Sequence, residues 1–310
     1  MVDLILPLGV VLCFVFGWNN SSYIVGNLAG SGTLSLGRSA VVAALGMMAG
    51  VLLEGPKMLT SLVGSLAYPV PSSGILITLA LSVALILALT LGRLPAPVSS
   101  AMVGAFLGVA YGLGSNINAG QAELVISFWF VAPFVAAILA FVFHRGLARL
   151  VSGFSLVGAD SFNRVGVVAG SLAVSYTLGA NNLGLIAGTS LSGAQSGQSY
   201  AIAVLFALVA VLGMLVLGRG GVSGTVGDRL LSLSPVGVIS VFASSALLVW
   251  AGTQLLVPMS ISQCVLGGML GSAFSQKSAF INFRLAYEAL STWVLVPVVA
   301  FVVAFMLVAL

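Results

Sequence analysis

Two short polar breaks interrupt long apolar runs at matching points of the chain. The first is Gly17-Trp18-Asn19-Asn20 and the second is Gly179-Ala180-Asn181-Asn182, so equivalent asparagines lie 162 residues apart in a chain of 310. Glycine-flanked breaks at corresponding points of two membrane-embedded halves are typical of proteins built from internal repeats. The backbone groups that a break frees need a partner, and a bound substrate or ion can be that partner. The pattern predicts two related halves, each with a broken first membrane helix.

The composition indicates that most of the protein surface does not face water. Hydrophobic residues make up 60% of the chain and charged residues only 5%, whereas a soluble domain carries roughly 25% charged residues. We therefore expect an all-α membrane protein in the cell (inner or plasma) membrane. Cys13 and Cys264 lie in apolar runs without zinc-ligand spacing, so they are expected to be buried thiols, and any metal site stays unknown.

The apolar runs predict about ten membrane spans, each of the roughly 17–25 residues that a spanning helix needs. The fourth span of each half is short enough to be re-entrant. The expected spans are 2–30, 39–56, 74–92, 96–114 and 122–144 in the first half, and 164–190, 198–218, 235–256, 258–274 and 284–310 in the second.

The basic residues sort onto one side of this ten-span arrangement. Connections after the odd-numbered spans hold nine of the ten Lys and Arg residues, and only Lys57 falls on the other side. The positive-inside rule then places both termini outside the cell and residues 145–163 in the cytoplasm. Because each half has five spans, the second half is inverted relative to the first. The expected parts are a membrane repeat over 1–144, a cytoplasmic connector over 145–163, and an inverted repeat over 164–310.

A second motif recurs in both halves, offset by 163 residues. The segment 95–104 (PAPVSSAMVG) aligns with 258–267 (PMSISQCVLG). Each begins with proline, a favoured first residue of a helix, and places hydroxyl or amide side chains in the first turns. A helix start offers free N–H groups and the positive end of the helix dipole, so the pair predicts an anion site.

An enzyme of the membrane is the contrasting class. Residues 221–224 (GVSG) match the Gly-x-Ser-Gly of membrane serine proteases, but they fall in a charged connection. The sole histidine, His144, ends another span, and no paired carboxylates lie within the spans. The sequence therefore predicts a transporter that is not an enzyme.

These motifs resemble the inorganic phosphate transporter (PiT) family over the whole chain. That family has a Gly-x-Asn-Asp-x-x-Asn-x-x-Gly break in each half, followed by a Pro-x-Ser-x-Thr-His helix start. The family aspartates are replaced here by Asn20 and Asn182, and its histidines by Ser100 and Gln263. The second asparagines become Tyr23 and Leu185, and the glutamate of the second span becomes Met47, with Ala210 at the counterpart position.

The lost aspartates favour sulfate as the substrate. Phosphate still carries a proton at neutral pH, which a carboxylate can accept, whereas a carboxylate only repels fully ionised sulfate. The chain also looks similar to the sulfate-permease branch of the family. We therefore expect a permease for an inorganic oxyanion, with sulfate favoured, that works by alternating access. An inorganic phosphate symporter and a passive anion channel are the alternatives.

We expect the anion to lie near the bilayer midplane, between the two breaks and the two helix starts. The same residues also suit plainer roles, since asparagine can cap a kink and serine permits tight helix packing. The candidate binding side chains are Asn19, Asn20, Ser99, Ser100, Asn181, Asn182, Ser260, Ser262 and Gln263, with close backbone approach at Gly17, Gly26, Gly179 and Gly188.

The partners expected beside the anion are few. The lipid bilayer follows from the composition, and the family resemblance implies a homodimer. Nothing indicates nucleic acid. No cofactor is expected, and Na+ or H+ is the coupling ion to test, because carbonyl and hydroxyl oxygens can bind Na+ without a carboxylate.

Overall fold

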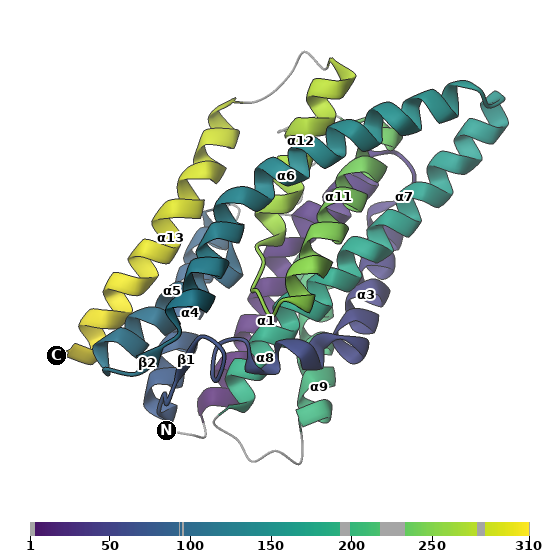
Figure 1. Cartoon of the computed structure of the whole chain (residues 1–310). Helices are drawn as coiled ribbons and strands as arrows, with labels where there is room; N and C mark the ends of the chain where they lie inside the picture. Colours follow the sequence, from purple (N-terminus) through teal and green to yellow (C-terminus); the bar gives the residue numbers. More distant parts are fainter. Residues whose placement is uncertain are drawn as a thin grey trace.

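A computed structural model describes residues 4–92, 94, 96–192, 199–217, 233–277 and 283–309. Over these residues the chain forms a bundle of helices (Figure 1). The helical elements in chain order are α1 (Ile5–Ser21), η2 (Ser22–Gly26), α2 (Asn27–Gly30), α3 (Leu36–Leu53), η3 (Gly55–Thr60), α4 (Ser72–Leu91), α5 (Val98–Gly112), α6 (Ala119–Ser152), α7 (Leu156–Leu178), η4 (Gly179–Leu183), α8 (Gly184–Leu191), α9 (Ser199–Leu217), α11 (Pro235–Gln254), α12 (Ile261–Gln276) and α13 (Phe283–Ala309).

The prediction of an all-helical membrane protein is confirmed, and each expected span falls on a helix or a continuous helical run. By length and composition alone, six described helical segments can cross a membrane: Ile5–Gly30, Leu36–Leu53, Ser72–Leu91, Ala119–Ser152, Pro235–Gln254 and Leu290–Ala309. The helices Val98–Gly112 and Ala201–Val216 are apolar but shorter. The count of ten spans therefore stays a prediction.

The two polar breaks are not unwound, which corrects the expectation of broken helices. The first helix continues from α1 through η2 into α2, and the corresponding helix continues from α7 through η4 into α8. Both η2 and η4 are single turns of π-helix. A π-turn widens the helix by one residue per turn and so re-aims side chains without ending the helix, and such turns are frequent at functional sites.

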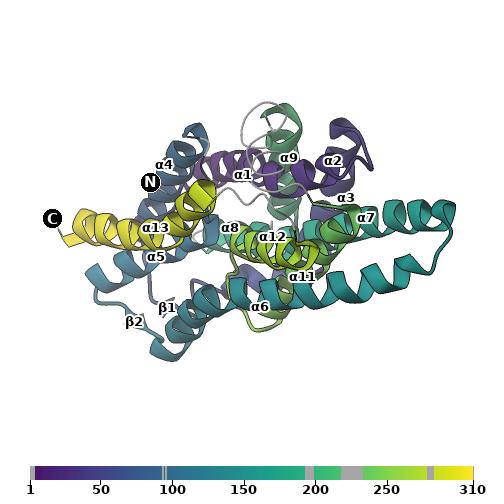
Figure 2. The same ribbon diagram turned by 90° about the horizontal axis from the view of Figure 1, so that it is seen from above.

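The first and second halves interlock rather than lie side by side as separate bodies. Helix α1 packs against α9, and α7 packs against α3. Helix α5 packs against α13, and α12 packs against α6. In Figure 2, which looks down the bundle, α12 lies among helices of both halves. Every one of these pairs joins one half to the other, so the core is shared between them.

The expected connector 145–163 is helical, which corrects its description as a separate part. Residues 145–152 belong to α6 and 156–163 belong to α7, with a turn of three residues between them. Helix α6 has 34 residues, so it is about 51 Å long at roughly 1.5 Å per residue, well beyond the roughly 30 Å hydrocarbon core. This hairpin extends from the bundle at the end opposite to the start of α1 and the end of α13 (Figure 1).

Two short strands, which the sequence did not predict, tie two connections together at one end of the bundle. Strand β1 (Ala67–Tyr68) pairs antiparallel with β2 (Asn116–Ile117), with Ala67 opposite Ile117. These strands link the segment before α4 to the segment after α5.

Candidate functional site

A small cavity lies where the two predicted motifs meet, in the interior of the bundle. Helices α5 and α12 both begin there, after extended segments, and α1 and η4 form the opposite walls. We call this space the anion cavity; its volume is about 150 Å³. It is lined by Phe16, Asn20, Ala96, Val98, Ser99, Asn182, Ser260, Ile261 and Ser262.

The structure therefore brings together five of the nine side chains that the sequence proposed for binding. Asn20 comes from α1, Asn182 from η4, Ser99 from the first turn of α5, and Ser260 and Ser262 from the start of α12. All five are almost completely buried. The space between them is too narrow for a water-sized sphere, so an ion enters only when the surrounding helices move apart.

The asparagine at the second position of each pair points its oxygen away from the helix backbone. The Asn182 side-chain N–H donates to the Met259 carbonyl at 2.9 Å. Because a carbonyl can only accept, this bond sets the orientation of the amide. The Asn182 side-chain oxygen is buried and has no hydrogen-bond partner. The Asn20 amide is oriented the same way by a bond from its N–H to the Phe16 carbonyl at 3.0 Å.

The first asparagine of each pair has a different job, because its amide binds the segment that precedes a helix start. Asn181 donates to the Thr253 hydroxyl and to the Val257 carbonyl, both at 3.0 Å, and accepts from the Met259 N–H at 2.8 Å. Neither Asn19 nor Asn181 lines the cavity. Their expected role in substrate binding is therefore revised to holding the walls in place.

The same bracket occurs in the first half. Asn19 donates to the Thr90 hydroxyl at 2.9 Å and to the Leu94 carbonyl at 3.4 Å, and accepts from the Ala96 N–H at 3.2 Å. Sequence reasoning missed Thr90 and Thr253. They are 163 residues apart, the offset already found for the helix starts, so extending the internal alignment to single threonines would have found them.

The serines differ in how far they are satisfied. The Ser99 hydroxyl donates to the Met259 carbonyl at 3.0 Å, so that carbonyl receives bonds from both halves of the protein. Ser260 and Ser262 bond each other at 3.0 Å, and the Tyr23 hydroxyl lies beside Ser262. The phenol of Tyr23 is a wall element that the sequence did not propose.

Two predicted binding residues lie outside the anion cavity. Ser100 is buried without a hydrogen-bond partner, but it does not line the cavity. Gln263 lines a different, larger cavity between α5, α6, α12 and α13. Both follow a lining serine directly in sequence, and successive helical residues point about 100° apart, so only one of each pair faces the anion cavity.

The predicted glycine approach is real, but its target is a neighbouring helix and not a ligand. A Cβ at Gly17 would collide with the Ala210 carbonyl of α9, and a Cβ at Gly179 would collide with the Met47 carbonyl of α3. Gly188 packs in the same way on Leu59 of η3, whereas Gly26 is the last residue of η2. The positions where the resembling family carries glutamate therefore serve here as packing surfaces for glycine.

No Asp, Glu, Lys or Arg lines the anion cavity. Among the residues that the structure describes, no cluster of three or more His, Cys, Asp and Glu side chains is placed to hold a metal ion. The polar groups available are amide oxygens, serine hydroxyls and the free N–H groups at the starts of α5 and α12. Such a set suits an anion held by hydrogen bonds and helix dipoles, and its oxygens suit Na+.

Comparisons with known proteins agree on one family. A model of the phosphate transporter family matches residues 16–304. The chain is 22% identical to a putative phosphate permease of Methanocaldococcus jannaschii, over 99% of this chain and 96% of that protein. It is 24% identical to a probable low-affinity inorganic phosphate transporter of Bacillus subtilis, over 65% of this chain and 63% of that protein.

The fold is also found among solved structures. The chain superimposes on a protein described as the sodium-dependent phosphate transporter with a TM-score of 0.83 and 17% sequence identity, over 99% of this chain and 98% of the other. At this identity the likeness concerns the fold alone.

Proposed function

The chain belongs to the phosphate transporter family, and from that membership we propose that it carries inorganic phosphate across a membrane by alternating access around the anion cavity. The sequence favoured sulfate because asparagine replaces the family aspartates. The comparisons give that preference no support, since the relatives named above are phosphate permeases or transporters. Phosphate, the earlier alternative, is therefore the proposed substrate.

One observation in the anion cavity supports phosphate on physical grounds. The buried side-chain oxygen of Asn182 has no partner, and it can only accept a hydrogen bond. Phosphate at neutral pH still has at least one O–H group that can donate to this oxygen. Sulfate has none, so its approach would leave the Asn182 oxygen facing a negatively charged oxygen. The expectation that both amides would act as donors overlooked the Met259 carbonyl, which occupies the Asn182 N–H.

The remaining oxygens of the anion would meet donors. The starts of α5 and α12 supply free backbone N–H groups at Val98, Ser99, Ile261 and Ser262, and the Ser260–Ser262 pair has one hydroxyl proton that is not used within the pair. Each hydrogen bond to a charged group contributes roughly 1.5–3 kcal/mol. The cavity would thus bind through several such bonds without a cationic side chain.

The alternating-access mechanism draws support from the matched contacts of the two halves. Gly17 on Ala210 and Gly179 on Met47 are equivalent contacts, as are Gly104 on Pro297 and Gly267 on Pro133. Equivalent contacts in both halves are what an inverted repeat would produce, and such a repeat can rock between two states of similar energy. The inverted repeat and the ten spans remain part of this proposal.

For the coupling ion we propose Na+. The oxygens of Asn20, Asn182 and the nearby serines form a set without carboxylate or histidine, which gives no group for proton exchange near neutral pH. The related solved structure is described as sodium-dependent, which agrees with this choice. A passive anion channel stays the alternative, distinguished by whether uptake can run against a gradient.

The test is uptake of radiolabelled phosphate into proteoliposomes, with and without an inward Na+ gradient and with sulfate as the competitor. We expect accumulation against the phosphate gradient only with Na+, and at least tenfold weaker competition by sulfate. Sulfate uptake as fast as phosphate uptake would overturn the substrate assignment. Equal phosphate uptake without any ion gradient, ending at equilibrium, would favour the channel.

A further inference from the structure

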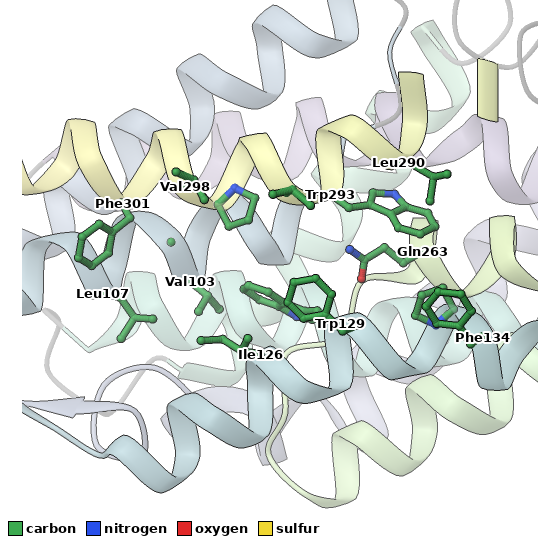
Figure 3. Close-up of a pocket in the computed structure, with 15 residues that line it drawn as sticks. Val103, Leu107, Ile126, Trp129, Phe134, Gln263, Leu290, Trp293, Val298 and Phe301 are labelled. Atoms are coloured by element: carbon green, nitrogen blue, oxygen red, sulfur yellow. The ribbon is translucent and has the colours of Figure 1, made fainter. Parts of the chain in front are cut away.

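A second and larger cavity lies beside the anion cavity, on the outer side of the bundle. It has a volume of about 470 Å³ and is formed by α5, α6, α12 and α13 (Figure 3). Its walls are almost entirely apolar and include Val103, Trp129, Phe134, Trp293 and Val298. The volume falls within the roughly 300–1,000 Å³ of sites that hold small molecules.

One polar side chain projects into this apolar space. Gln263 is 2% exposed, and its amide forms no hydrogen bond with any other residue that the structure describes. Figure 3 shows the amide between the indoles of Trp129 and Trp293. A buried amide without a partner is destabilising by roughly 1–3 kcal/mol. The Gln263 amide is therefore a group whose partner has to come from outside the chain.

The two indoles flank the amide in different ways. The Trp129 N–H donates to the Pro258 carbonyl at 2.9 Å, which fixes that ring to the segment leading into α12. The Trp293 N–H is buried and has no hydrogen-bond partner. Rings on both sides of a single amide favour a flat ligand, because aromatic rings stack well on flat partners in offset arrangements.

The depth of the cavity restricts what can enter it. Helix α13 has 27 residues, and Trp293 is ten residues from its start, about 15 Å along the helix at roughly 1.5 Å per residue. That distance is about half of the roughly 30 Å hydrocarbon core. A charged head group or a phospholipid ester lies at the membrane surface and does not reach this depth.

The opening of the cavity faces the membrane. Phe130 and Phe134 of α6 and Val298 of α13 line it and are 60%, 70% and 54% exposed, respectively. Apolar side chains this exposed on spanning helices lie against lipid tails. An occupant therefore enters sideways from the hydrocarbon and has to be uncharged.

We propose that this cavity binds a membrane-soluble lipid with a flat, carbonyl-bearing ring, of the quinone class. The ring lies between Trp129 and Trp293, a ring carbonyl accepts a hydrogen bond from the Gln263 amide, and the apolar tail leaves past Val298. Because Ser262, the residue before Gln263, lines the anion cavity, the occupant touches the same helix start that the anion does. The binding site is independent of which anion is carried.

The experiment uses the purified full chain in lipid nanodiscs with a decyl-substituted benzoquinone as the probe. Benzoquinones quench indole fluorescence, and two of the four tryptophans line the cavity. Three variants are compared with the unmodified chain. Gln263→Leu removes the polar partner, Val298→Phe fills the opening, and Val302→Phe adds the same ring on α13 at a residue outside the lining.

We expect saturable quenching in the unmodified chain and in Val302→Phe, and at least tenfold weaker affinity in Val298→Phe and Gln263→Leu. Quenching that rises linearly with the quinone-to-lipid ratio and is equal in all four proteins would overturn the site. A phospholipid with brominated acyl chains is the second probe. If it quenches saturably and quinone does not displace it, the occupant is an ordinary acyl chain and the ring-lipid proposal is wrong. If Val298→Phe instead changes the oligomeric state, the cavity is a contact between copies.

Discussion

The side-chain oxygen of Asn181 accepts a hydrogen bond from the backbone N–H of Met259 at 2.8 Å, across 78 residues of sequence. This bond ties the π-turn of the second half to the segment that leads into α12. The Met259 carbonyl then accepts from Asn182 and from Ser99. Met259 is therefore the point at which both asparagines of one break and the helix start of the other half are joined.

The first prediction separates the two asparagines of a pair. Asn181→Ala leaves the buried Met259 N–H and Val257 carbonyl without a partner, which is destabilising by roughly 1–3 kcal/mol for each group. Asn182→Ala frees one N–H contact on a carbonyl that keeps its bond from Ser99. We expect a large fall in the thermal unfolding midpoint for Asn181→Ala and a smaller fall for Asn182→Ala. Equal midpoints for the two variants would contradict the positioning role.

The second prediction concerns phosphate affinity. Asn20→Ala, Asn182→Ala, Ser99→Ala and Ser262→Ala each remove a polar group from the wall of the anion cavity. A lost bond to a charged ligand is worth roughly 1.5–3 kcal/mol, so phosphate binding measured by calorimetry should weaken about tenfold or more. Ser100→Ala is the matched control, since Ser100 lies next to Ser99 but does not line the cavity. Unchanged affinity in all four variants would place the anion elsewhere.

The third prediction tests the contacts between the two halves. Gly17→Ala and Gly179→Ala place a methyl group against a backbone carbonyl of the facing helix. Over-packing of this kind typically costs 1–3 kcal/mol, and a backbone atom has little room to move, so roughly 3 kcal/mol is expected. Gly146→Ala is the control, because a Cβ there meets nothing within 4 Å. It should be neutral or slightly stabilising by helix propensity. Thermal unfolding in detergent is the measurement.

The fourth prediction concerns topology. The basic residues predict that both termini are extracytoplasmic and that residue 155 is cytoplasmic. The helical bundle agrees in part, since α1 begins and α13 ends opposite to the α6–α7 turn (Figure 1). Cysteines introduced singly, on a background without Cys13 and Cys264, are labelled from outside intact cells. Labelling at position 155 together with none at either end would reverse the orientation.

The fifth prediction concerns a polar contact between the end of α3 and the end of α11. Glu54 accepts a hydrogen bond from the Gln254 amide at 2.9 Å and lies 3.5 Å from the Lys57 ammonium. Lys57 in turn donates to the Gln254 oxygen at 2.7 Å. Burial raises the pKa of Glu54, but the hydrogen bonds from Gln254 and Trp250 and the charge of Lys57 outweigh it, and the net pKa is lowered.

A lowered pKa in the folded state means that the carboxylate stabilises the fold above the unfolded pKa of about 4.3. The contribution is lost as the pH falls through the lower folded pKa. The unfolding midpoint of the unmodified chain should exceed that of Glu54→Gln at pH 7, and the difference should shrink as the pH falls below about 4. A difference that is constant from pH 7 to pH 3 would contradict this assignment.

Much of the candidate site was predictable because the chain repeats its motifs. Asn20, Asn182, Ser99, Ser260 and Ser262 were found from recurrence at one spacing, and they meet in one cavity. The roles of Asn19 and Asn181 were not predictable, because adjacent residues of a helix point in different directions and the sequence does not say which one faces the cavity. The π-turns, which set those directions, have no residue pattern distinct from that of a break.

The sequence by itself determined the membrane class, the places of the helices and the recurrence between the halves, since hydrophobicity and its interruptions are local properties. Only the tertiary structure decided which groups remain unpaired. The Asn182 oxygen is left for a ligand because Met259, 77 residues away, takes the amide N–H. Gln263 faces the outer cavity because α6 and α13 close around it. Hydrogen bonds and cavities depend on segments distant in the chain, and their partners exist only once the halves have packed together.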